Sequence, residues 1–217
     1  MKRNFYVSMM CADLRYIEQE VLDFQQAGID GFHMDIMDGE FVPNFALGLE
    51  DIKAVKKAAS IPVDAHLMVV NPQKKIDIFI EQGLDIIYVH PEAQDNLIPI
   101  FEALRKHQIK VGIALNPETS VKSIVPLLPL VDKVMVMTVT PGFAGQAYIE
   151  EMNDKIVKLA KLNTEHRFEI VVDGAISAQR IAQLSNMGVE GFVLGTSSGL
   201  FKPDANRAEV INYLRQV

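Results

Sequence analysis

Residues 33–45 read HMDIMDGEFVPNF and begin with an alternation that is typical of a β-strand. His33, Asp35 and Met37 occupy every second position, so one face of the predicted strand carries an imidazole, a carboxylate and a thioether. The residues between them are apolar, which suits a strand whose other face is buried. The polar face suits a metal site.

The same arrangement recurs later in the chain. The segment PVDAHLMV places Asp64, His66 and Met68 at alternate positions, and Asp173 is the last strand-like residue of FEIVVD before a glycine. Two histidines and several carboxylates at the ends of separate strands indicate a site that a barrel assembles.

Eight short apolar or β-branched runs follow one another along the 217-residue chain at fairly even intervals. The predicted strands are residues 5–10, 31–36, 63–67, 86–90, 111–115, 133–138, 169–173 and 191–194. Amphipathic patterns between them predict helices at residues 13–27, 50–59, 72–82, 96–107, 118–128, 149–162, 178–187 and 205–215.

Eight strand–helix units with right-handed crossovers most readily close into a (β/α)8 TIM barrel, an α/β fold, and an open doubly wound sheet is the alternative. No linker or low-complexity block divides the chain, so residues 1–217 are predicted to form a single domain. A barrel predicts polar side chains at the C-terminal ends of its strands. Such positions are occupied by Ser8, Asp35, His66, His90, Asn116, Thr138, Asp173 and Gly195.

The formal net charge of −7 argues against a nucleic-acid partner, because such binding depends on Lys and Arg neutralising phosphates. A small anionic substrate is compatible with this charge if local donors hold it. No apolar run approaches the roughly 18 residues of a membrane-spanning helix, so no membrane partner is expected. The single cysteine, Cys11, fits a reducing cytoplasm and is predicted to be an apolar core residue rather than a catalytic thiol.

Four side chains of these strand ends form a candidate metal site. A lone histidine in a strand is more often a hydrogen-bonded core residue, but the alternating positions and the shared barrel end favour a common site. Imidazole nitrogen together with carboxylate oxygen suits one divalent ion such as zinc, manganese, cobalt or iron. The predicted metal ligands are His33, Asp35, His66 and Asp173.

Five separated motifs resemble those of the ribulose-phosphate 3-epimerase family, in the same order and over essentially the whole chain. They are HMDIMDGEFVPN, DAHLMV, ALNPET, VMVMTVTPGFAGQ and VDGAIS. The resemblance implies a barrel of the ribulose-phosphate-binding type, a ketose-phosphate substrate and a homo-oligomer. It also implies that the four residues above hold the metal ion, and that Asp35 and Asp173 transfer protons.

The implied reaction explains why two aspartates are needed. A 3-epimerase removes the C3 proton beside a C2 ketone and returns a proton to the opposite face, so two opposed carboxylates serve better than one base. A carbon acid beside a ketone is very weak, and a metal at the C2 and C3 oxygens stabilises the enediolate as a Lewis acid.

Further substrate contacts are implied by the resemblance. Met37, Met68 and Met137 would pack on the flat intermediate, although simple core filling is the alternative. Ser8 would hydrogen-bond the substrate, but Val7 stands where the family commonly has proline.

Glycine-rich segments after the last three predicted strands suggest a phosphate site, because barrels of this kind hold phosphate with backbone N–H groups from these loops. The segments are PGFAGQ at 141–146, GAIS at 174–177 and GTSSG at 195–199. Each could instead be a turn. The candidate phosphate contacts are Gly142, Gly145, Gly174, Gly195, Thr196 and Ser197, with Phe143 and Ala144 in a loop able to close over the sugar.

Three polar residues near these motifs have two interpretations each. Asp64 either orients a metal ligand or makes a buried structural hydrogen bond. His90 and Glu92 either contact the metal ligands from the side away from the metal or shape a loop. His107 and His166 lie beside Lys or Arg near predicted helix ends, and we assign them no chemistry.

The segments TVTPGFAGQAYI, LNPET and GTSSGLF look more like those of the allulose-phosphate branch of the family. This resemblance, carried by Thr138, Ala144 and Thr196, implies 3-epimerisation of D-allulose 6-phosphate to D-fructose 6-phosphate. D-Ribulose 5-phosphate is the alternative substrate. A decarboxylase resembling the orotidine-phosphate enzymes is disfavoured, because Asp35-Ile36-Met37-Asp38 lacks their lysine. A non-catalytic sugar-phosphate-binding barrel is a more remote alternative.

Overall fold

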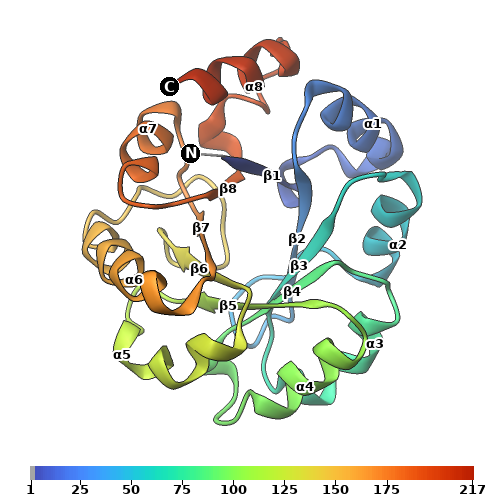
Figure 1. The fold of residues 1–217 in the computed structure, drawn as a ribbon. Helices are drawn as coiled ribbons and strands as arrows, with labels where there is room; N and C mark the ends of the chain where they lie inside the picture. Colours follow the sequence, from blue (N-terminus) through green and yellow to red (C-terminus); the bar gives the residue numbers. More distant parts are fainter. Residues whose placement is uncertain (1–2) are drawn as a thin grey trace.

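The structure, a computed structural model, describes residues 3–217, so residues 1 and 2 of the predicted domain lie outside the described residues. Parallel strands β1 to β8 pair in chain order and β8 closes on β1 (Figure 1). The strands are β1 Asn4–Ser8, β2 Gly31–Met37, β3 Val63–Met68, β4 Ile86–Val89, β5 Lys110–Leu115, β6 Lys133–Met137, β7 Glu169–Asp173 and β8 Gly191–Leu194. The predicted TIM barrel is therefore confirmed, and the open sheet is wrong.

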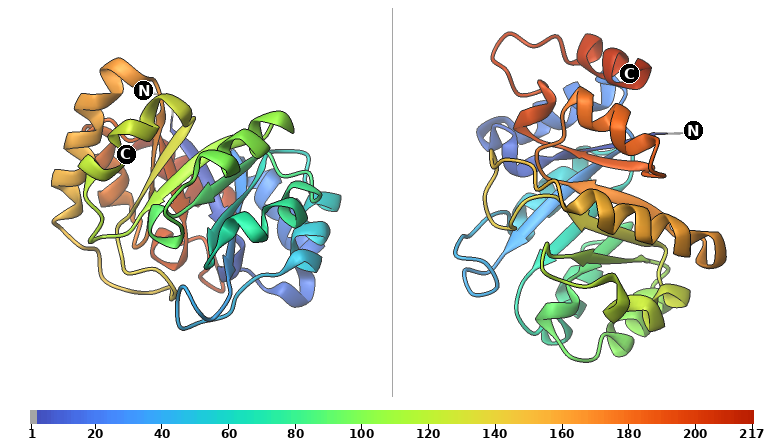
Figure 2. Two further views of the ribbon diagram at one scale, coloured as in Figure 1. Left: turned by 90° about the horizontal axis from the view of Figure 1, so that it is seen from below. Right: turned by 90° about the vertical axis from the view of Figure 1, so that its left-hand side faces the viewer.

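Helices follow the strands and surround the barrel, as the two side views show (Figure 2). They are α1 Ile17–Ala27, α2 Leu49–Ala58, α3 Ile76–Ile80, α4 Ile98–Lys106, α5 Val121–Ile124, α6 Met152–His166, α7 Ala178–Ser185 and α8 Arg207–Gln216. Within residues 3–217, no helix has both the length and the apolar character needed to span a bilayer.

Several predicted elements are shorter than expected. The first strand ends at Ser8 rather than at residue 10, because its last pairs are Ser8 with His33 and Val7 with Leu194 and no partner extends further. The helix predicted at 118–128 is only the four-residue α5, followed by a 3₁₀ helix at Val125–Leu130. Prolines in that segment lack the N–H group that an α-helix would need there.

The register between β2 and β3 aligns the two polar alternations. His33 pairs with Asp64, Asp35 with His66, and Met37 with Met68. Parallel strands place paired residues side by side on the same face. The histidines and carboxylates of both strands therefore meet on the inner face of the barrel, while the residues between them join the apolar layer beneath the helices.

The amino-terminal end of the barrel is closed by a separate polar group. Lys133 Nζ donates to Tyr6 Oη at 2.5 Å and lies 2.9 Å from Glu169 Oε2. Above this group, the ring of Tyr88 fills the space beside Gly112, where an added Cβ would lie 2.2 Å from that ring. Tyr88 in turn lies beneath His33, with ring centroids 6.1 Å apart. The barrel floor thus supports the side chains at its mouth.

Candidate active site

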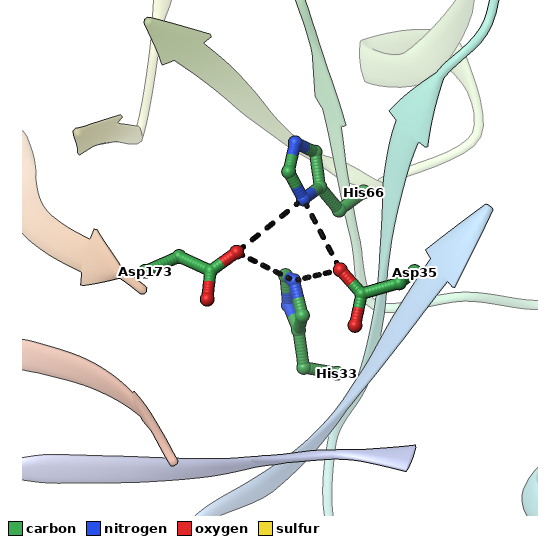
Figure 3. Close-up of side chains that lie close together, drawn as sticks. All are labelled: His33, Asp35, His66 and Asp173. Carbon is green, nitrogen blue, oxygen red and sulfur yellow. Dashed lines mark ion pairs between the residues drawn. The ribbon is translucent and has the colours of Figure 1, made fainter. Parts of the chain in front are cut away.

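Four side chains from three strands converge at the carboxyl end of the barrel (Figure 3). They are His33 and Asp35 of β2, His66 of β3 and Asp173 of β7, and one potential ligand atom from each lies within 4.8 Å of all the others. Asp35 Oδ1 is 3.4 Å from His33 Nε2 and 3.5 Å from His66 Nδ1. Asp173 Oδ2 is 3.9 Å and 3.7 Å from the same two nitrogens.

The two ring nitrogens that face this cluster are buried and make no hydrogen bond. Buried polar atoms are normally paired, so His33 Nε2 and His66 Nδ1 call for a partner that lies between them and the carboxylates. Two imidazole nitrogens and two carboxylate oxygens form a donor set that zinc, manganese, cobalt and iron accept. The residues present therefore fit one divalent ion.

The two aspartates have opposite electrostatic environments. Burial and, after it, the charge of Asp35 together raise the pKa of Asp173 to about 7. Burial acts on Asp35 too, but the charges and hydrogen bonds of His33 and His66 outweigh it and lower the pKa of Asp35. The structure thus favours a carboxylate at Asp35 and makes Asp173 the more readily protonated of the two.

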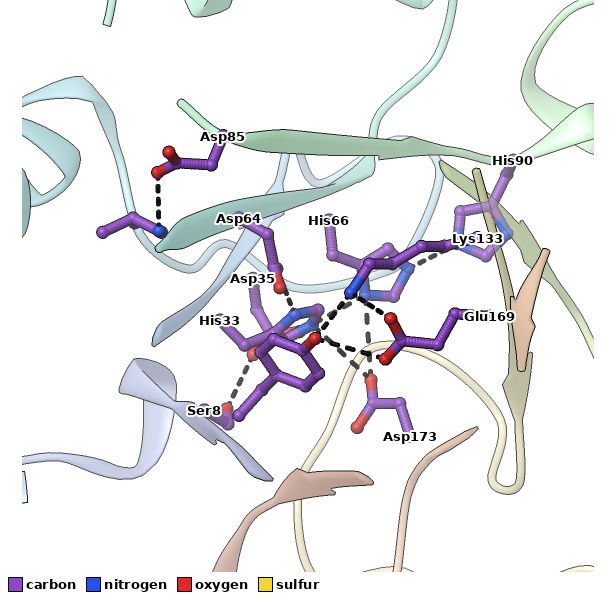
Figure 4. Close-up of polar contacts among 12 residues, drawn as sticks. Ser8, His33, Asp35, Asp64, His66, Asp85, His90, Lys133, Glu169 and Asp173 are labelled. Atoms are coloured by element: carbon purple, nitrogen blue, oxygen red, sulfur yellow. Dashed lines mark hydrogen bonds and ion pairs between the residues drawn. The ribbon is translucent and has the colours of Figure 1, made fainter. Parts of the chain in front are cut away.

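Three members of the cluster, namely His33, His66 and Asp35, also have a polar partner on the far side (Figure 4). Asp64 Oδ1 lies 2.5 Å from His33 Nδ1, His90 Nε2 lies 2.7 Å from His66 Nε2, and Ser8 Oγ donates to Asp35 Oδ2 at 2.7 Å. Of the two interpretations of Asp64, the geometry supports the one in which it orients His33. Ser8 contacts an aspartate directly, besides lying at the pocket wall.

A single pocket opens above the cluster and contains all the residues predicted to contact substrate. These are Ser8, Met37, Met68, Met137, Gly142, Phe143, Ala144, Gly145, Gly174, Gly195, Thr196 and Ser197. Met37 and Met68 also pack against Val42 in a small apolar cluster, so they line the pocket and fill space at once. Phe143 is half exposed at the rim.

Some lining residues were missed by the sequence analysis. Cys11, predicted to be a core residue, instead lines the pocket, because β1 ends at Ser8 and the chain turns there into a 3₁₀ helix. Burial raises the pKa of the Cys11 thiol, which disfavours a nucleophilic thiolate. Gln146 and Ala175 also line the pocket; both lie within the predicted glycine-rich segments at 141–146 and 174–177, although neither was named as a contact.

Thr138 has a different place from the one expected. It is fully buried, and its hydroxyl donates to the carbonyl oxygens of Asp173 at 2.9 Å and Gly174 at 2.5 Å. It is not among the residues that line the pocket. Its identity therefore carries no direct information about substrate length, and it instead anchors the end of β7 that bears Asp173.

Two loops meet across the pocket mouth. Asn44, in the loop after β2, donates from Nδ2 to the carbonyl oxygen of Gly142 at 2.7 Å.

Gly174 has a φ of +115°, and a Cβ at this position would lie 2.6 Å from a methyl group of Val139. Only glycine fits there without displacement. The backbone conformation after β7 therefore depends on this residue.

Comparison with known proteins adds to this geometry. The family model described as "Ribulose-phosphate 3 epimerase family" matches residues 4–200. The chain belongs to this family. The match confirms the resemblance that the five motifs indicated.

Curated relatives of this epimerase family agree with the assignment. A ribulose-phosphate 3-epimerase of Methanocaldococcus jannaschii is 36% identical over 209 residues, covering 94% of this chain and 87% of the relative. That of Treponema pallidum is 34% identical over 201 residues, covering 91% and 92%. That of Bacillus subtilis is 33% identical over 193 residues, covering 88% and 89%. The chain is accordingly an isomerase of the epimerase class.

Solved structures with the same architecture are more distant in sequence. A 3-keto-L-gulonate-6-phosphate decarboxylase from Vibrio cholerae has a TM-score of 0.75 at 13% identity, covering 100% of this chain and 97% of that structure. The tryptophan synthase alpha-subunit from Pyrococcus furiosus, as an E103A mutant, has a TM-score of 0.70 at 13% identity, covering 100% and 97%. These similarities support the barrel fold alone, because one fold hosts many chemistries.

Proposed function

We propose that this epimerase interconverts D-ribulose 5-phosphate and its C3 epimer, with one divalent ion at the four-residue cluster. The observation that carries the proposal is the convergence of Asp35 and Asp173, whose oxygens lie within 4.8 Å of each other beside two unpaired imidazole nitrogens. The curated relatives described above are named for ribulose phosphate.

The five-carbon substrate replaces the six-carbon one expected from sequence. D-Allulose 6-phosphate finds no support among these relatives, and Thr138, which carried part of that preference, does not line the pocket. Ala144 and Thr196 do line it, but a pocket wall alone distinguishes one extra hydroxymethylene only weakly, by about 1–3 kcal/mol.

Substrate orientation follows from the polarity of the pocket. Its glycine-rich rim, including Gly145, Gly174 and Gly195, can offer backbone N–H groups to a phosphate, and Asp35 and Asp173 line the same pocket. In the proposed pose the phosphate lies at this rim and C3 lies between the two carboxyl groups. Met37 and Met68 then cover the reacting carbons and exclude water.

The opposed pKa shifts suit inversion at C3. Asp35, held as a carboxylate by the two histidines, accepts the C3 proton from one face. Asp173, with its raised pKa, is the group that donates a proton to the other face. The reverse reaction exchanges these roles. Held by His33, His66 and both aspartates, the divalent ion supplies Lewis-acid stabilisation of the negative charge that develops on the ketone oxygen.

Parallel kinetics test the substrate. The metal-loaded enzyme is assayed on D-ribulose 5-phosphate and on D-allulose 6-phosphate under identical conditions, and we expect kcat/KM to be higher for the former by about 10–200-fold. A ratio reversed in favour of D-allulose 6-phosphate would return the assignment to the six-carbon sugar. Tight binding of both with no turnover of either would instead favour a sugar-phosphate-binding barrel.

A further inference from the structure

The two histidines of the cluster are supported in different ways from behind. His33 Nδ1 lies 2.5 Å from a carboxylate oxygen of Asp64, which is the direct carboxylate–histidine contact common at metal sites. His66 has no carboxylate on its far side. Its Nε2 lies 2.7 Å from Nε2 of a second histidine, His90 of the segment after β4. An imidazole is a weaker support than a carboxylate unless it is itself connected to one.

Such a connection exists through Glu92. His90 Nδ1 is fully buried, makes no hydrogen bond within the usual angular limits, and lies 3.3 Å from Glu92 Oε2 in an ion-pair contact. The other oxygen of Glu92 accepts from the backbone N–H of Asn116 at 3.2 Å and from the hydroxyl of Thr119. The carboxylate is therefore anchored to the loop after β5, and one of its oxygens is left for His90.

The ring of His90 is also held in place. It stacks on His66 with centroids 5.0 Å apart and contacts the ring of Phe41 at 4.8 Å. Because both imidazoles have no exposed surface, solvent water does not compete for their nitrogens.

This geometry permits only one proton arrangement when His66 is a metal ligand. Its Nδ1 faces Asp35 and Asp173 and must be unprotonated to bind a metal, so the neutral ring carries its proton on Nε2. That proton points at His90 Nε2, which must therefore accept. His90 then carries its own proton on Nδ1, directed at the Glu92 carboxylate. Both rings are fixed in a single tautomer by one carboxylate at the end of the chain of contacts.

We propose that Glu92, acting through His90, is a positioning residue that sets the tautomer and orientation of His66 for metal binding. The inference rests on the proposed metal site. Its competitor is a loop-building role, in which Glu92 serves only to hold Asn116 and Thr119. The two roles predict different metal affinities for a variant that remains folded. Loss of a positioning residue weakens metal binding, whereas loss of a loop contact alone leaves it unchanged.

The test measures Co²⁺ affinity of the metal-free chain by competition with a chelator, together with the Co²⁺ absorption spectrum. His90→Leu removes the acceptor for the His66 N–H at similar volume, whereas His90→Gln retains a side-chain oxygen acceptor. Glu92→Gln removes the charge at the end of the chain of contacts. Glu118→Gln, in the loop after β5 to which Glu92 is anchored, removes the same charge and is the matched control for net charge.

We expect His90→Leu and Glu92→Gln to weaken Co²⁺ binding by about 10–100-fold, with an altered spectrum, and His90→Gln to recover much of the loss. Glu118→Gln should bind as the wild type does. Thermal unfolding of each metal-free variant identifies any that fail to fold. If Glu92→Gln fails to fold, the comparison of His90→Leu with His90→Gln provides the test.

The inference is overturned if folded His90→Leu and Glu92→Gln bind Co²⁺ with wild-type affinity, a result that leaves the proposed function standing. It is also overturned if His90→Gln is as defective as His90→Leu. If instead the wild type itself takes up no Co²⁺, the metal site of the proposed function fails, and the positioning role fails with it.

Discussion

The carboxyl groups of Asp35 and Asp173 come from β2 and β7 yet present oxygens within 4.8 Å of each other. They differ in environment: Asp35 lies closer to the two histidine nitrogens and also accepts a hydrogen bond from Ser8, whereas Asp173 lies farther from these nitrogens and its pKa is raised by burial and by the charge of Asp35. One site therefore holds a base and an acid of the same chemical type.

Replacement of either aspartate by asparagine should abolish most of the turnover. Asp35→Asn and Asp173→Asn each keep the side-chain volume and remove one proton-transfer group, so kcat should fall by about 10²–10⁴-fold or more. Ser8→Ala, which removes the hydrogen bond to Asp35 but no proton-transfer group, should have a smaller effect. Steady-state assays on purified, folded variants provide the measurement, and near-wild-type kcat in either asparagine variant would contradict the two-base scheme.

Asp173 should also make the metal-free protein less stable as the pH rises. Its folded-state pKa of about 7 lies above the ordinary carboxyl value, so the folded state binds the extra proton and loses this stabilisation between about pH 4 and pH 7. Since each pKa unit corresponds to about 1.36 kcal/mol, the Asp173→Asn protein should be the more stable one at pH 8.

The measurement is chemical denaturation of both metal-free proteins across this pH range. The stability difference between Asp173→Asn and wild type should grow from pH 4 to pH 7 and then level off. A difference that is constant with pH would show that Asp173 ionises normally.

Asp64 should influence metal affinity rather than the chemical step. Asp64→Asn weakens the support of His33 Nδ1, so metal affinity should fall by about 10–100-fold. Elemental analysis after dialysis against a chelator, followed by assay at saturating metal, separates the two effects. Normal metal content with a reduced kcat would argue against this role.

The Asn44 side chain should help to hold the pocket mouth closed. Asn44→Ala removes the bond to the carbonyl of Gly142, worth about 1 kcal/mol, so kcat/KM should fall about fivefold, mainly through KM. Asn186→Ala removes a similar amide–carbonyl bond on α7, away from the pocket, and is the control. Equal effects of the two substitutions would contradict the loop contact.

Gly174→Ala should disturb the end of β7 more than the backbone strain of a positive φ alone would. The added Cβ would lie 2.6 Å from Val139 in a backbone conformation with φ +115°, whereas Gly28→Ala imposes a positive φ with no atom within 4 Å. Melting temperature and KM should therefore change more for Gly174→Ala. Comparable changes in both variants would show that backbone strain dominates.

Much of the barrel and of the four-residue cluster at its mouth could be predicted because strands have a period of two. His33 and Asp35 had to share a face, and the rule for strand ends placed Asp173 at the same rim. The β2–β3 register, which sets His33 against Asp64, depends on the closed sheet and is not encoded in local spacing. The His66–His90 contact could not be anticipated for the same reason.

Loop residues were less predictable. The positions of three such residues depend on where a strand ends and on how two loops meet, both of which are set by the tertiary structure. These residues are Cys11, Asn44 and Thr138. Thr138 cannot carry the substrate preference drawn from it, because its side chain binds backbone carbonyls and does not line the pocket.

Solvent deuterium exchange tests the central claim most directly, namely that Asp35 and Asp173 act on C3 from opposite faces. The metal-loaded enzyme is run in D₂O on D-ribulose 5-phosphate and, separately, on its C3 epimer. We predict that the wild-type product carries deuterium at C3, while Asp35→Asn and Asp173→Asn each exchange C3 hydrogen in only one epimer, and not the same one. A product that keeps its original C3 hydrogen, or two variants that exchange the same epimer, would contradict the account.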